Sequence, residues 1–359
     1  MTTYLLAGGG TAGHVNPLLA VADALRERES DAEVIVLGTK EGLEARLVPE
    51  RGYELAVIPK VPFPRRLNGA ALRFPGAFRR ARKLTQELIR ERNVEVVVGF
   101  GGYASTPAYV AAKRERVPLA IHEANARPGL ANRLGARYTR FVGVAFHGTK
   151  IRNARFVGMP LRREIEQLDL DAARREGIDF FGLDPARQTL LVTGGSQGAR
   201  RLNNTILESA ASIVDAGWQI IHLIGDKADL EDPGIPNYHV LRYCDRMDLA
   251  LAVADFAVSR AGAATVSELT AVGVPAVYVP YPVGNGEQRL NAADAVGANG
   301  AILIADALFV PSWVQSTLLP LLGDRVRITD MAAQSRHIGS LEGTKRMLQL
   351  IDDARSNVR

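Results

Sequence analysis

The amino-acid sequence predicts an α/β protein made of two doubly wound, Rossmann-like domains with parallel sheets, and three observations support this. First, 359 residues are too many for one ordinary hydrophobic core, since domains average roughly 150 residues. Second, a glycine turn of the form G-G-[ST]-x-G occurs twice, at 9–13 and 194–198, each time after a β-rich run and before a helical pattern. Third, segments 94–106 and 254–268 also correspond, and strands alternate with helices in both halves.

The domain boundary is predicted near Met159–Leu161, because a polar, charged stretch begins there. We expect an N-terminal domain at 1–160 and a C-terminal domain at 161–339. The remaining segment, 340–359, has a helical pattern that begins at Ser340. Its own residues do not indicate which domain it packs on, so packing back on the N-terminal domain stays open.

Composition narrows the class of protein. Hydrophobic residues make up 47% and charged residues 23%, as in soluble globular proteins. The single cysteine, Cys244, excludes an intramolecular disulfide and a Cys-pair metal site, which favours a reducing compartment such as the cytoplasm. We find neither a leader pattern nor an apolar run of 18 residues, so the chain is not expected to cross a membrane or to be exported by its own signal.

The first glycine loop, GGGTAGH at 8–14, indicates a phosphate site. Gly8, Gly10 and Gly13 also fit the dinucleotide pattern G-x-G-x-x-G, but the next predicted strand ends in 38–40 without the acid that would bind a ribose. Ligands of parallel sheets bind at the carboxyl ends of the strands, where free N–H groups at a helix start face a phosphate. We therefore expect the loops of the two domains to face each other across a cleft, with two phosphorylated ligands or one that spans it.

An acid does follow a glycine loop in the second half. Glu268 falls one turn into a helix that is expected to begin at 263–265. A carboxylate there can accept hydrogen bonds from two vicinal ribose hydroxyls, or it can be an ordinary first-turn helix acid. Both interpretations stay open on the residues alone. By contrast, Asp169 and Asp171 lie in the polar stretch after the boundary, where a helix cap is a better interpretation than a metal site.

A basic segment lies between Lys60 and Arg92, with ten Lys or Arg against two Glu, while the whole chain has a net charge of +5. From Pro75 the segment predicts a helix with one apolar face, formed by Phe74, Phe78, Ala81, Leu84 and Leu88. Such a helix suits an anionic membrane surface, and the same pattern also fits a solvated helix packed on its own domain.

Seven motifs in order resemble the MurG family of peptidoglycan glycosyltransferases. They are GGGTAGH at 8–14, FGGYAS at 100–105, HEAN at 122–125, VGMPLR at 157–162, GGSQGAR at 194–200, RAGAATVSE at 260–268 and EQRLNA at 287–292. The family transfers N-acetylglucosamine from UDP-N-acetylglucosamine to undecaprenyl-pyrophosphoryl-N-acetylmuramoyl pentapeptide. The resemblance implies a GT-B fold, a donor site in the C-terminal domain, and a lipid acceptor taken by the N-terminal domain at the cytoplasmic face of the plasma membrane.

The resemblance also implies roles for individual residues. On the donor side these are Arg162, Ser196, the backbone at Cys244 opposite the uracil, Ala263, Ala264, Thr265, Glu268 and Gln288. The residues that would meet the sugar or the acceptor from the other wall are Thr11, Ala12, Gly13 and Asn125, and those facing the acceptor pyrophosphate are Gly9, Gly10, Gly101 and Gly102. Two positions depart from the family pattern: Ala12 replaces a glycine, and Glu287 replaces a glutamine, which puts any sugar contact at 287 in doubt.

The chemistry expected of this site is a single inverting displacement. His14 lies where the glycine turn meets the helix that Pro17 is expected to help start, so its imidazole can point into the cleft. A neutral His14 suits removal of the proton from the sugar 4-hydroxyl, although it would also suit a phosphate-binding or loop-holding role, with Glu123 as the next candidate base. Negative charge on the leaving UDP is expected to be stabilised by Arg162 and a helix N-terminus, so we expect no metal ligand set and no cofactor.

Two rival functions follow from the same residues. A nucleotide-sugar 2-epimerase shares the two-domain architecture, but has no use for a membrane helix. A module that binds nucleic acid or another polyanion through the segment 63–92 leaves the paired glycine loops unexplained, and aromatic residues are only 6% of the chain, few for base stacking. We therefore expect a peripheral enzyme at an anionic membrane surface rather than a nucleic-acid partner.

Overall fold

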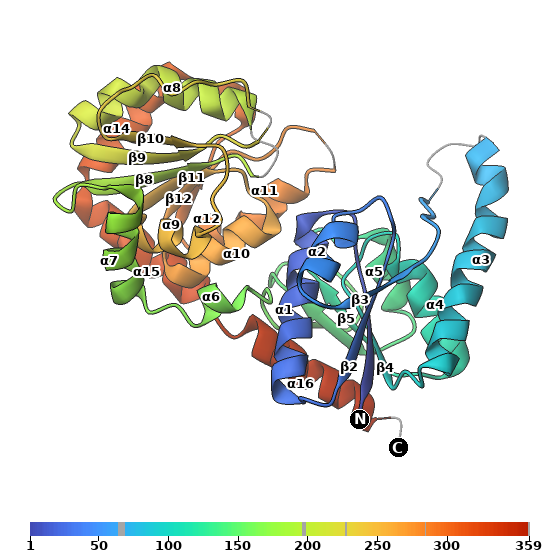
Figure 1. The fold of residues 1–359 in the computed structure, drawn as a ribbon. Coiled ribbons are helices and arrows are strands. Elements are labelled where there is room, and N and C mark those ends of the chain that lie inside the picture. Colours follow the sequence, from blue (N-terminus) through green and yellow to red (C-terminus); the bar gives the residue numbers. More distant parts are fainter. Residues whose placement is uncertain (64–68, 196–198, 227, 284, 358–359) are drawn as a thin grey trace. The chain divides into compact units, whose positions relative to one another are not determined.

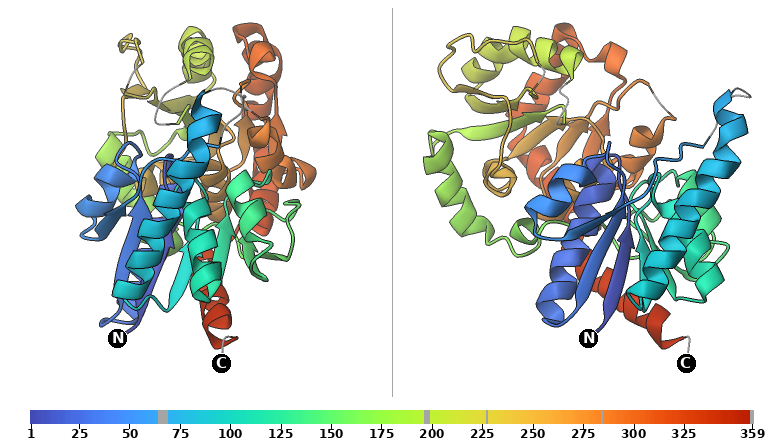
Figure 2. Two further views of the ribbon diagram at one scale, coloured as in Figure 1. Left: turned by 90° about the vertical axis from the view of Figure 1, so that its right-hand side faces the viewer. Right: turned by 45° about the vertical axis from the view of Figure 1, so that its right-hand side comes forward.

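The computed structural model describes residues 1–63, 69–195, 199–226, 228–283 and 285–357, with only the backbone described at 69–72. The chain divides into two compact units, each described by itself below (Figures 1 and 2). The N-terminal unit contains Met1–Arg162 together with Glu342–Arg359, and the C-terminal unit contains Arg163–Leu341.

The described part of the N-terminal unit contains a parallel sheet in the order β3-β2-β1-β4-β5-β6-β7. Its strands are β1 Thr3–Ala7, β2 Glu33–Gly38, β3 Glu54–Val57, β4 Val96–Gly99, β5 Leu119–Glu123, β6 Phe141–Val144 and β7 Ala154–Phe156. Its helices are α1 Ala12–Arg28, α2 Glu44–Glu50, α3 Gly69–Glu91, α4 Ser105–Glu115, α5 Leu130–Gly135 and α16 Gly343–Ser356.

The described part of the C-terminal unit repeats this topology, with the parallel strand order β10-β9-β8-β11-β12-β13. The strands are β8 Gln188–Thr193, β9 Trp218–Leu223, β10 Tyr238–Leu241, β11 Phe256–Ser259, β12 Ala276–Tyr278 and β13 Ala301–Leu303. The helices are α6 Arg163–Glu166, α7 Leu170–Phe181, α8 Arg200–Asp215, α9 Met247–Val253, α10 Ala263–Val272, α11 Glu287–Asn291, α12 Ala293–Gly297, α13 Pro311–Trp313, α14 Leu319–Gly323 and α15 Arg325–Ile338, with a 3₁₀ helix at Asp306–Leu308 and a π-helical segment at Val314–Leu318.

These two sheets confirm the predicted fold class. In each unit the first strand lies between the second and the fourth, β1 between β2 and β4, and β8 between β9 and β11. The order in which successive strands are added therefore reverses beside the first strand in both units. Ligands of doubly wound sheets bind at this switch point, outside the carboxyl ends of the strands.

Alternate residues of β1 explain the three layers of the N-terminal unit. Tyr4 and Leu6 join a buried cluster with residues of α1 and α16, whereas Leu5 and Ala7 join one with residues of α3 and α4. This period of two is what a strand buried on both faces produces. The figures show the same arrangement, with α1 and α16 on one side of the sheet and α3 and α4 on the other (Figure 1).

The C-terminal helix α16 belongs to the N-terminal unit, which answers the question the sequence left open. Met347, Leu350 and Ile351 are buried in the same cluster as α1. The helix begins at Gly343 rather than at the expected Ser340. A Cβ at Gly343 would overlap the Met159 carbonyl, so a glycine is needed where the helix meets the unit.

Two expected helix starts were wrong. Helix α1 begins at Ala12, five residues before Pro17, and α3 begins at Gly69, six residues before Pro75. The pattern placed each proline at a helix start because a free N–H is not needed there. In the structure each proline lies inside its helix, at the cost of one intrahelical hydrogen bond. In the described part of the chain, no helix combines the length and the apolarity that crossing a bilayer requires.

Candidate functional site

The N-terminal site is built where two glycine turns meet at the carboxyl edge of the sheet. One turn joins β1 to α1, and the other joins β4 to α4. The turns touch, since a Cβ on Gly102 would overlap the backbone of Gly9. Ser105, the first residue of α4, reinforces the contact by donating a hydrogen bond of 2.9 Å to the Ala7 carbonyl. The structure thus brings together the four glycines predicted to face the acceptor pyrophosphate.

His14 lies in the first turn of α1 with its imidazole against this meeting point. Its Nδ1 is 3.1 Å from the Gly9 carbonyl oxygen and 3.3 Å from Oγ1 of Thr11. A carbonyl oxygen can only accept, so Nδ1 carries the proton and Nε2 carries the lone pair of the neutral ring. A Cβ at Gly101 would stand 3.2 Å from Nε2, which places the basic nitrogen beside the second glycine turn.

Glu123 ends β5 and holds the loop that carries Asn125. Its carboxylate accepts from the backbone N–H of Asn125, the backbone N–H of Gly129 and the side-chain amide of Asn132, each at 2.9 Å. Burial raises the pKa of Glu123, while these donors and the nearby His14 act in the opposite direction. Because its oxygens already accept three hydrogen bonds, Glu123 is better suited to positioning Asn125 than to acting as the base.

The sequence analysis missed Glu44, the first residue of α2. This side chain is 1% exposed and accepts from Gly10 N at 2.7 Å, Thr39 N at 3.0 Å and Thr39 Oγ1 at 2.9 Å. An acid does therefore follow β2, as the dinucleotide pattern requires. This acid binds the glycine loop and not a ribose. The Gly10 N–H that was expected to face a pyrophosphate is already bonded to this carboxylate.

In the C-terminal unit, the predicted donor residues follow strand ends. Cys244 comes after β10 and is buried, α10 begins at Ala263 after β11 as predicted, and Gln288 lies on α11 after β12. All these strands are parallel, so their carboxyl ends share one edge. Glu268 lies one turn into α10 and is partly buried. Ser196, also predicted for the donor, lies outside the described residues.

Hydrogen bonds join α11 to the loops that follow β11 and β12. The amide of Asn291 donates to the Ala261 carbonyl at 3.2 Å, and Oε1 of Gln288 accepts from Tyr281 N at 2.8 Å. Arg260, which sequence reasoning also missed, donates to the Val279 carbonyl at 2.9 Å and contacts Asp306 at 2.6 Å. These contacts tie the ends of β11 and β12 together, so the loop before α10 is held by its neighbours.

Arg162 is the last residue of the N-terminal unit's main segment, whereas the other described donor candidates belong to the C-terminal unit. Asp169 caps α7 by accepting from Ala172 N at 3.0 Å, which confirms the helix-cap interpretation of the Asp-x-Asp pair. Across the residues that the structure describes, no group of three His, Cys, Asp or Glu side chains is placed to hold a metal ion.

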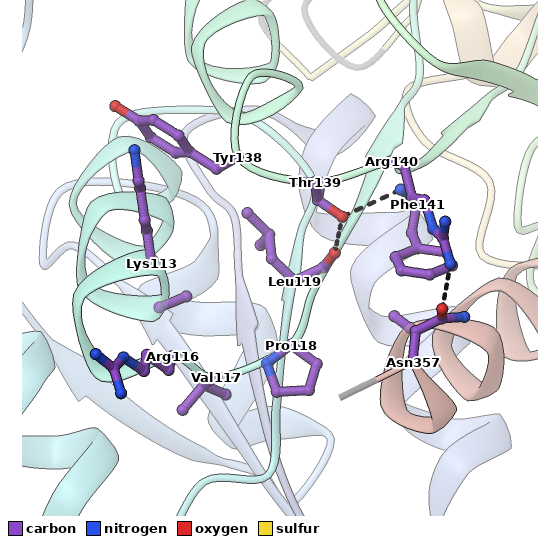
Figure 3. Close-up of a pocket in the computed structure, with 12 residues that line it drawn as sticks. Lys113, Arg116, Val117, Pro118, Leu119, Tyr138, Thr139, Arg140, Phe141 and Asn357 are labelled. Atoms are coloured by element: carbon purple, nitrogen blue, oxygen red, sulfur yellow. Dashed lines mark hydrogen bonds between the residues drawn. The ribbon is translucent and has the colours of Figure 1, made fainter. Parts of the chain in front are cut away.

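A separate hollow lies away from the glycine turns. It has a volume of about 540 Å³ and is lined near the starts of β5 and β6 by Leu119, Tyr138, Thr139, Arg140 and Phe141, among others (Figure 3). The amino ends of parallel strands lie at the edge opposite the carboxyl ends. This hollow is therefore no part of the site formed by the glycine turns.

Two parallel sheets of one topology, each with a glycine turn at its switch point, form the GT-B fold of nucleotide-sugar glycosyltransferases, as predicted. The model of the glycosyltransferase family 28 N-terminal domain matches residues 4–144, and that of the C-terminal domain matches residues 189–350. The chain belongs to glycosyltransferase family 28, and its activity is that of a glycosyltransferase.

Individual relatives are similar over almost their whole length. The chain is 64% identical over 351 residues to a protein of Leifsonia xyli, covering 98% of each, and 58% identical over 355 residues to one of Clavibacter sepedonicus, covering 99% of this chain and 97% of the relative. Both relatives carry the name UDP-N-acetylglucosamine–N-acetylmuramyl-(pentapeptide) pyrophosphoryl-undecaprenol N-acetylglucosamine transferase. The crystal structure of Acinetobacter baumannii MurG matches with a TM-score of 0.80 at 27% identity, covering 98% of this chain and 100% of that one. The resemblance to the MurG family is thereby confirmed.

His122, next to Glu123, makes the stability of the N-terminal unit depend on pH. Burial lowers the pKa of His122 to about 4, against about 6.5 in an unfolded chain. The contribution of the neutral His122 to the free energy of unfolding is therefore complete above pH 6.5. It is lost as the pH falls from 6.5 through the folded pKa of about 4, a difference of roughly 3 kcal/mol. We expect His122→Gln to lose less stability than the parent between pH 7.5 and 4.5, as measured by hydrogen exchange of the β5 amides in urea.

The matched control is His337→Gln, because His337 is exposed on α15. That change should leave the pH dependence as it is in the parent. Equal acid sensitivity of the parent and His122→Gln would show that another group is responsible.

Proposed function

We propose that this enzyme transfers N-acetylglucosamine from UDP-N-acetylglucosamine to the 4-hydroxyl of the N-acetylmuramyl sugar in undecaprenyl-pyrophosphoryl-N-acetylmuramoyl pentapeptide, a step of peptidoglycan synthesis. The observation that carries the proposal is 64% identity, over 98% of both chains, to a transferase with that name. The rest of the proposal assigns parts of the reaction to the two units.

The N-terminal unit is assigned the acceptor. Its two glycine turns leave backbone close to any bound group, and His14 and the Asn125 loop stand at the same edge of the sheet. Thr11, Ala12 and Gly13 complete the turn from which α1 begins. The predicted acceptor contacts at Gly9, Gly101 and Gly102 remain part of this assignment, whereas Gly10 contributes its conformation, because its N–H is bonded to Glu44.

The C-terminal unit is assigned the UDP sugar. Helix α10 is ten residues long, and its first N–H groups, at Ala263, Ala264 and Thr265, have no carbonyl partner inside the helix. Such a start favours negative charge, which increases on the diphosphate as UDP leaves. Glu268 is assigned the ribose hydroxyls, and Cys244 and Gln288 stand on neighbouring loops of the same edge. Arg162 and Ser196 keep their donor roles on the resemblance alone.

The reaction assigned to the site is one inverting displacement. His14 Nε2 takes the proton from the 4-hydroxyl as its oxygen attacks the anomeric carbon, and UDP leaves with the bonding electrons. The other proton stays on Nδ1, which donates to the Gly9 carbonyl throughout, so the ring can accept at Nε2 without changing its tautomer.

A labelled-sugar assay tests the proposed function and its rival together. With UDP-N-acetylglucosamine and a lipid-linked acceptor of short prenyl length, we expect sugar to move to the lipid with one UDP released for each transfer. With the donor alone we expect no 2-epimer. Epimer formation without acceptor, and no transfer with it, would replace the proposal by the epimerase reaction.

Replacing the proposed base should affect the chemical step more than binding. We expect His14→Ala to lower kcat by roughly 10²- to 10⁴-fold with the donor KM nearly unchanged, and to remove the acidic limb of the kcat profile against pH. Steady-state kinetics with both substrates varied measures this, with the exposed His337→Ala as a control. An unchanged kcat with a higher acceptor KM would make His14 a binding residue.

The ribose assignment of Glu268 is tested on the donor side. Two charge-assisted hydrogen bonds of about 1.5 to 3 kcal/mol each are at stake, so Glu268→Ala should raise the donor KM tenfold or more. The control is Glu208→Ala, which changes an exposed glutamate on α8 of the same unit. A donor KM that stays at the parental value would remove the assignment.

Membrane docking is assigned to the segment 63–92. The structure limits which of its side chains are available to contact a membrane. Four of the predicted apolar residues of α3, Phe74, Phe78, Ala81 and Leu88, pack on the core of their own unit. Leu84 remains 41% exposed, and Phe63 remains 64% exposed with its ring 5.4 Å from that of Phe74. Most of the apolar face is therefore used in folding, so docking must depend largely on charge.

The charges available for docking are fewer than the sequence count. Lys83 pairs with Glu87 and Arg90 with Glu115, while Arg92 contacts both Glu33 and Glu54. Arg73, Arg79 and Arg80 are exposed, and within the described residues no ion pair involves them. These three arginines, together with Phe63 and Leu84, support docking on the anionic cytoplasmic face of the membrane.

Charge reversal tests this docking. Each basic residue near an anionic bilayer contributes about 1 kcal/mol, so reversing Arg79 and Arg80 to Glu should weaken binding to phosphatidylglycerol vesicles by about 30-fold or more. Activity on a water-soluble acceptor should be kept. The control, Arg325→Glu with Arg327→Glu, makes the same change in net charge at exposed sites of the C-terminal unit. Vesicle binding that responds equally to both pairs, or to neither, would contradict the assignment.

A further inference from the structure

One peptide group of the first glycine turn is hydrogen-bonded on both sides. Its N–H, from Gly10, donates to Oε2 of Glu44 at 2.7 Å. Its carbonyl, from Gly9, lies 3.1 Å from Nδ1 of His14. A continuous chain of two hydrogen bonds therefore connects a buried carboxylate to the imidazole through a single planar peptide group.

Several contacts fix the position of the Glu44 carboxylate. Thr39 donates to Oε1 of Glu44 through both its backbone N–H, at 3.0 Å, and its hydroxyl, at 2.9 Å. Glycines surround the side chain: a Cβ on Gly9 or Gly42 would overlap the carboxylate, and one on Gly38 would stand 2.6 Å from Cγ. Three elements thus leave room for this carboxylate and hold it against the turn.

This arrangement has an electrostatic consequence. A negative charge that accepts from the N–H of a peptide polarises the group and makes its carbonyl a stronger acceptor. The Gly9 carbonyl then holds the Nδ1 proton of His14 more firmly. In other enzymes a carboxylate bonded directly to histidine fixes the tautomer and orients the ring, and here the peptide stands between the two groups.

We propose that Glu44 is a positioning residue for the transfer reaction, acting through the Gly9–Gly10 peptide to hold His14 in the tautomer that leaves Nε2 free to take the acceptor proton. The inference rests on the proposed role of His14 as the base. It differs from a purely structural role for Glu44, because a structural role would not depend on the imidazole.

A double-mutant cycle separates these roles. Glu44→Gln keeps the shape of the side chain and an oxygen for the Gly10 N–H, but removes the charge. We expect it to lower kcat roughly 10- to 100-fold and to leave the donor KM unchanged. Losses of this size are typical of residues that orient a functional group without contacting the substrate themselves. In the His14→Ala background the same change should have no further effect, because nothing remains to be positioned.

The imidazole itself provides a second readout that does not depend on activity. Nitrogen NMR of His14 should show the Nδ1-protonated tautomer in the parent and a mixture of tautomers in Glu44→Gln. Thr39→Val, which removes one donor to the carboxylate without touching the glycine turn, should move both readouts in the same direction by a smaller amount. This variant keeps the test available if Glu44→Gln fails to fold.

The control is Glu50→Gln, the same substitution on the same helix at an exposed glutamate that pairs with Arg46. It should leave kcat and the tautomer unchanged. Equal losses of kcat in the parent and His14→Ala backgrounds, or a tautomer that Glu44→Gln does not change, would overturn the inference. A changed tautomer together with full activity of His14→Ala would instead remove the base assignment, and with it the catalytic consequence proposed for Glu44.

Discussion

The close approach of two backbone turns, after β1 and after β4, is the constraint on which the N-terminal site depends. Adjacent parallel strands bring the turns to one edge, and the turns can touch only because neither Gly9 nor Gly102 carries a side chain. The same approach leaves the Gly9 carbonyl facing His14 and the Gly10 N–H facing Glu44. The backbone conformation of this turn therefore presents the carbonyl that fixes which nitrogen of the histidine is basic.

Much of this architecture follows from the sequence, and particular residues show where prediction ends. The repeated glycine turns and alternating strands predicted both sheets, because strand, turn and helix patterns are local. The start of α10 was predicted for the same reason. Glu44 could not be found this way, since its role depends on β1 and β2 lying side by side, which places Gly10 beside a residue 34 positions later. The starts of α1 and α3 were misplaced because Pro17 and Pro75 lie inside their helices, although proline prefers the first turn of a helix.

Helix α3 bears on two interpretations that the sequence could not separate, packing on its own domain and docking on a membrane. Its apolar residues pack against the sheet layer, as in an ordinary surface helix, yet Arg79 and Arg80 stay exposed beside Leu84. Folding uses the apolar stripe, and the exposed charge remains available for the proposed docking. An electrostatic contact of this kind is weak for each residue and sensitive to salt, which would suit the proposed transfer to a lipid-linked acceptor, because the enzyme would then have to reach the membrane and leave it.

The central proposal is that the two units bind different substrates, the acceptor on the N-terminal unit and the UDP sugar on the C-terminal unit. Hydrogen-exchange mass spectrometry with each ligand alone tests this claim most directly. UDP should protect amides at 241–247 and 260–268 without protecting 8–14, and a soluble acceptor analogue should protect 8–14 and 100–104 without protecting 260–268. Protection of 8–14 by UDP, with 260–268 unaffected, would contradict the account.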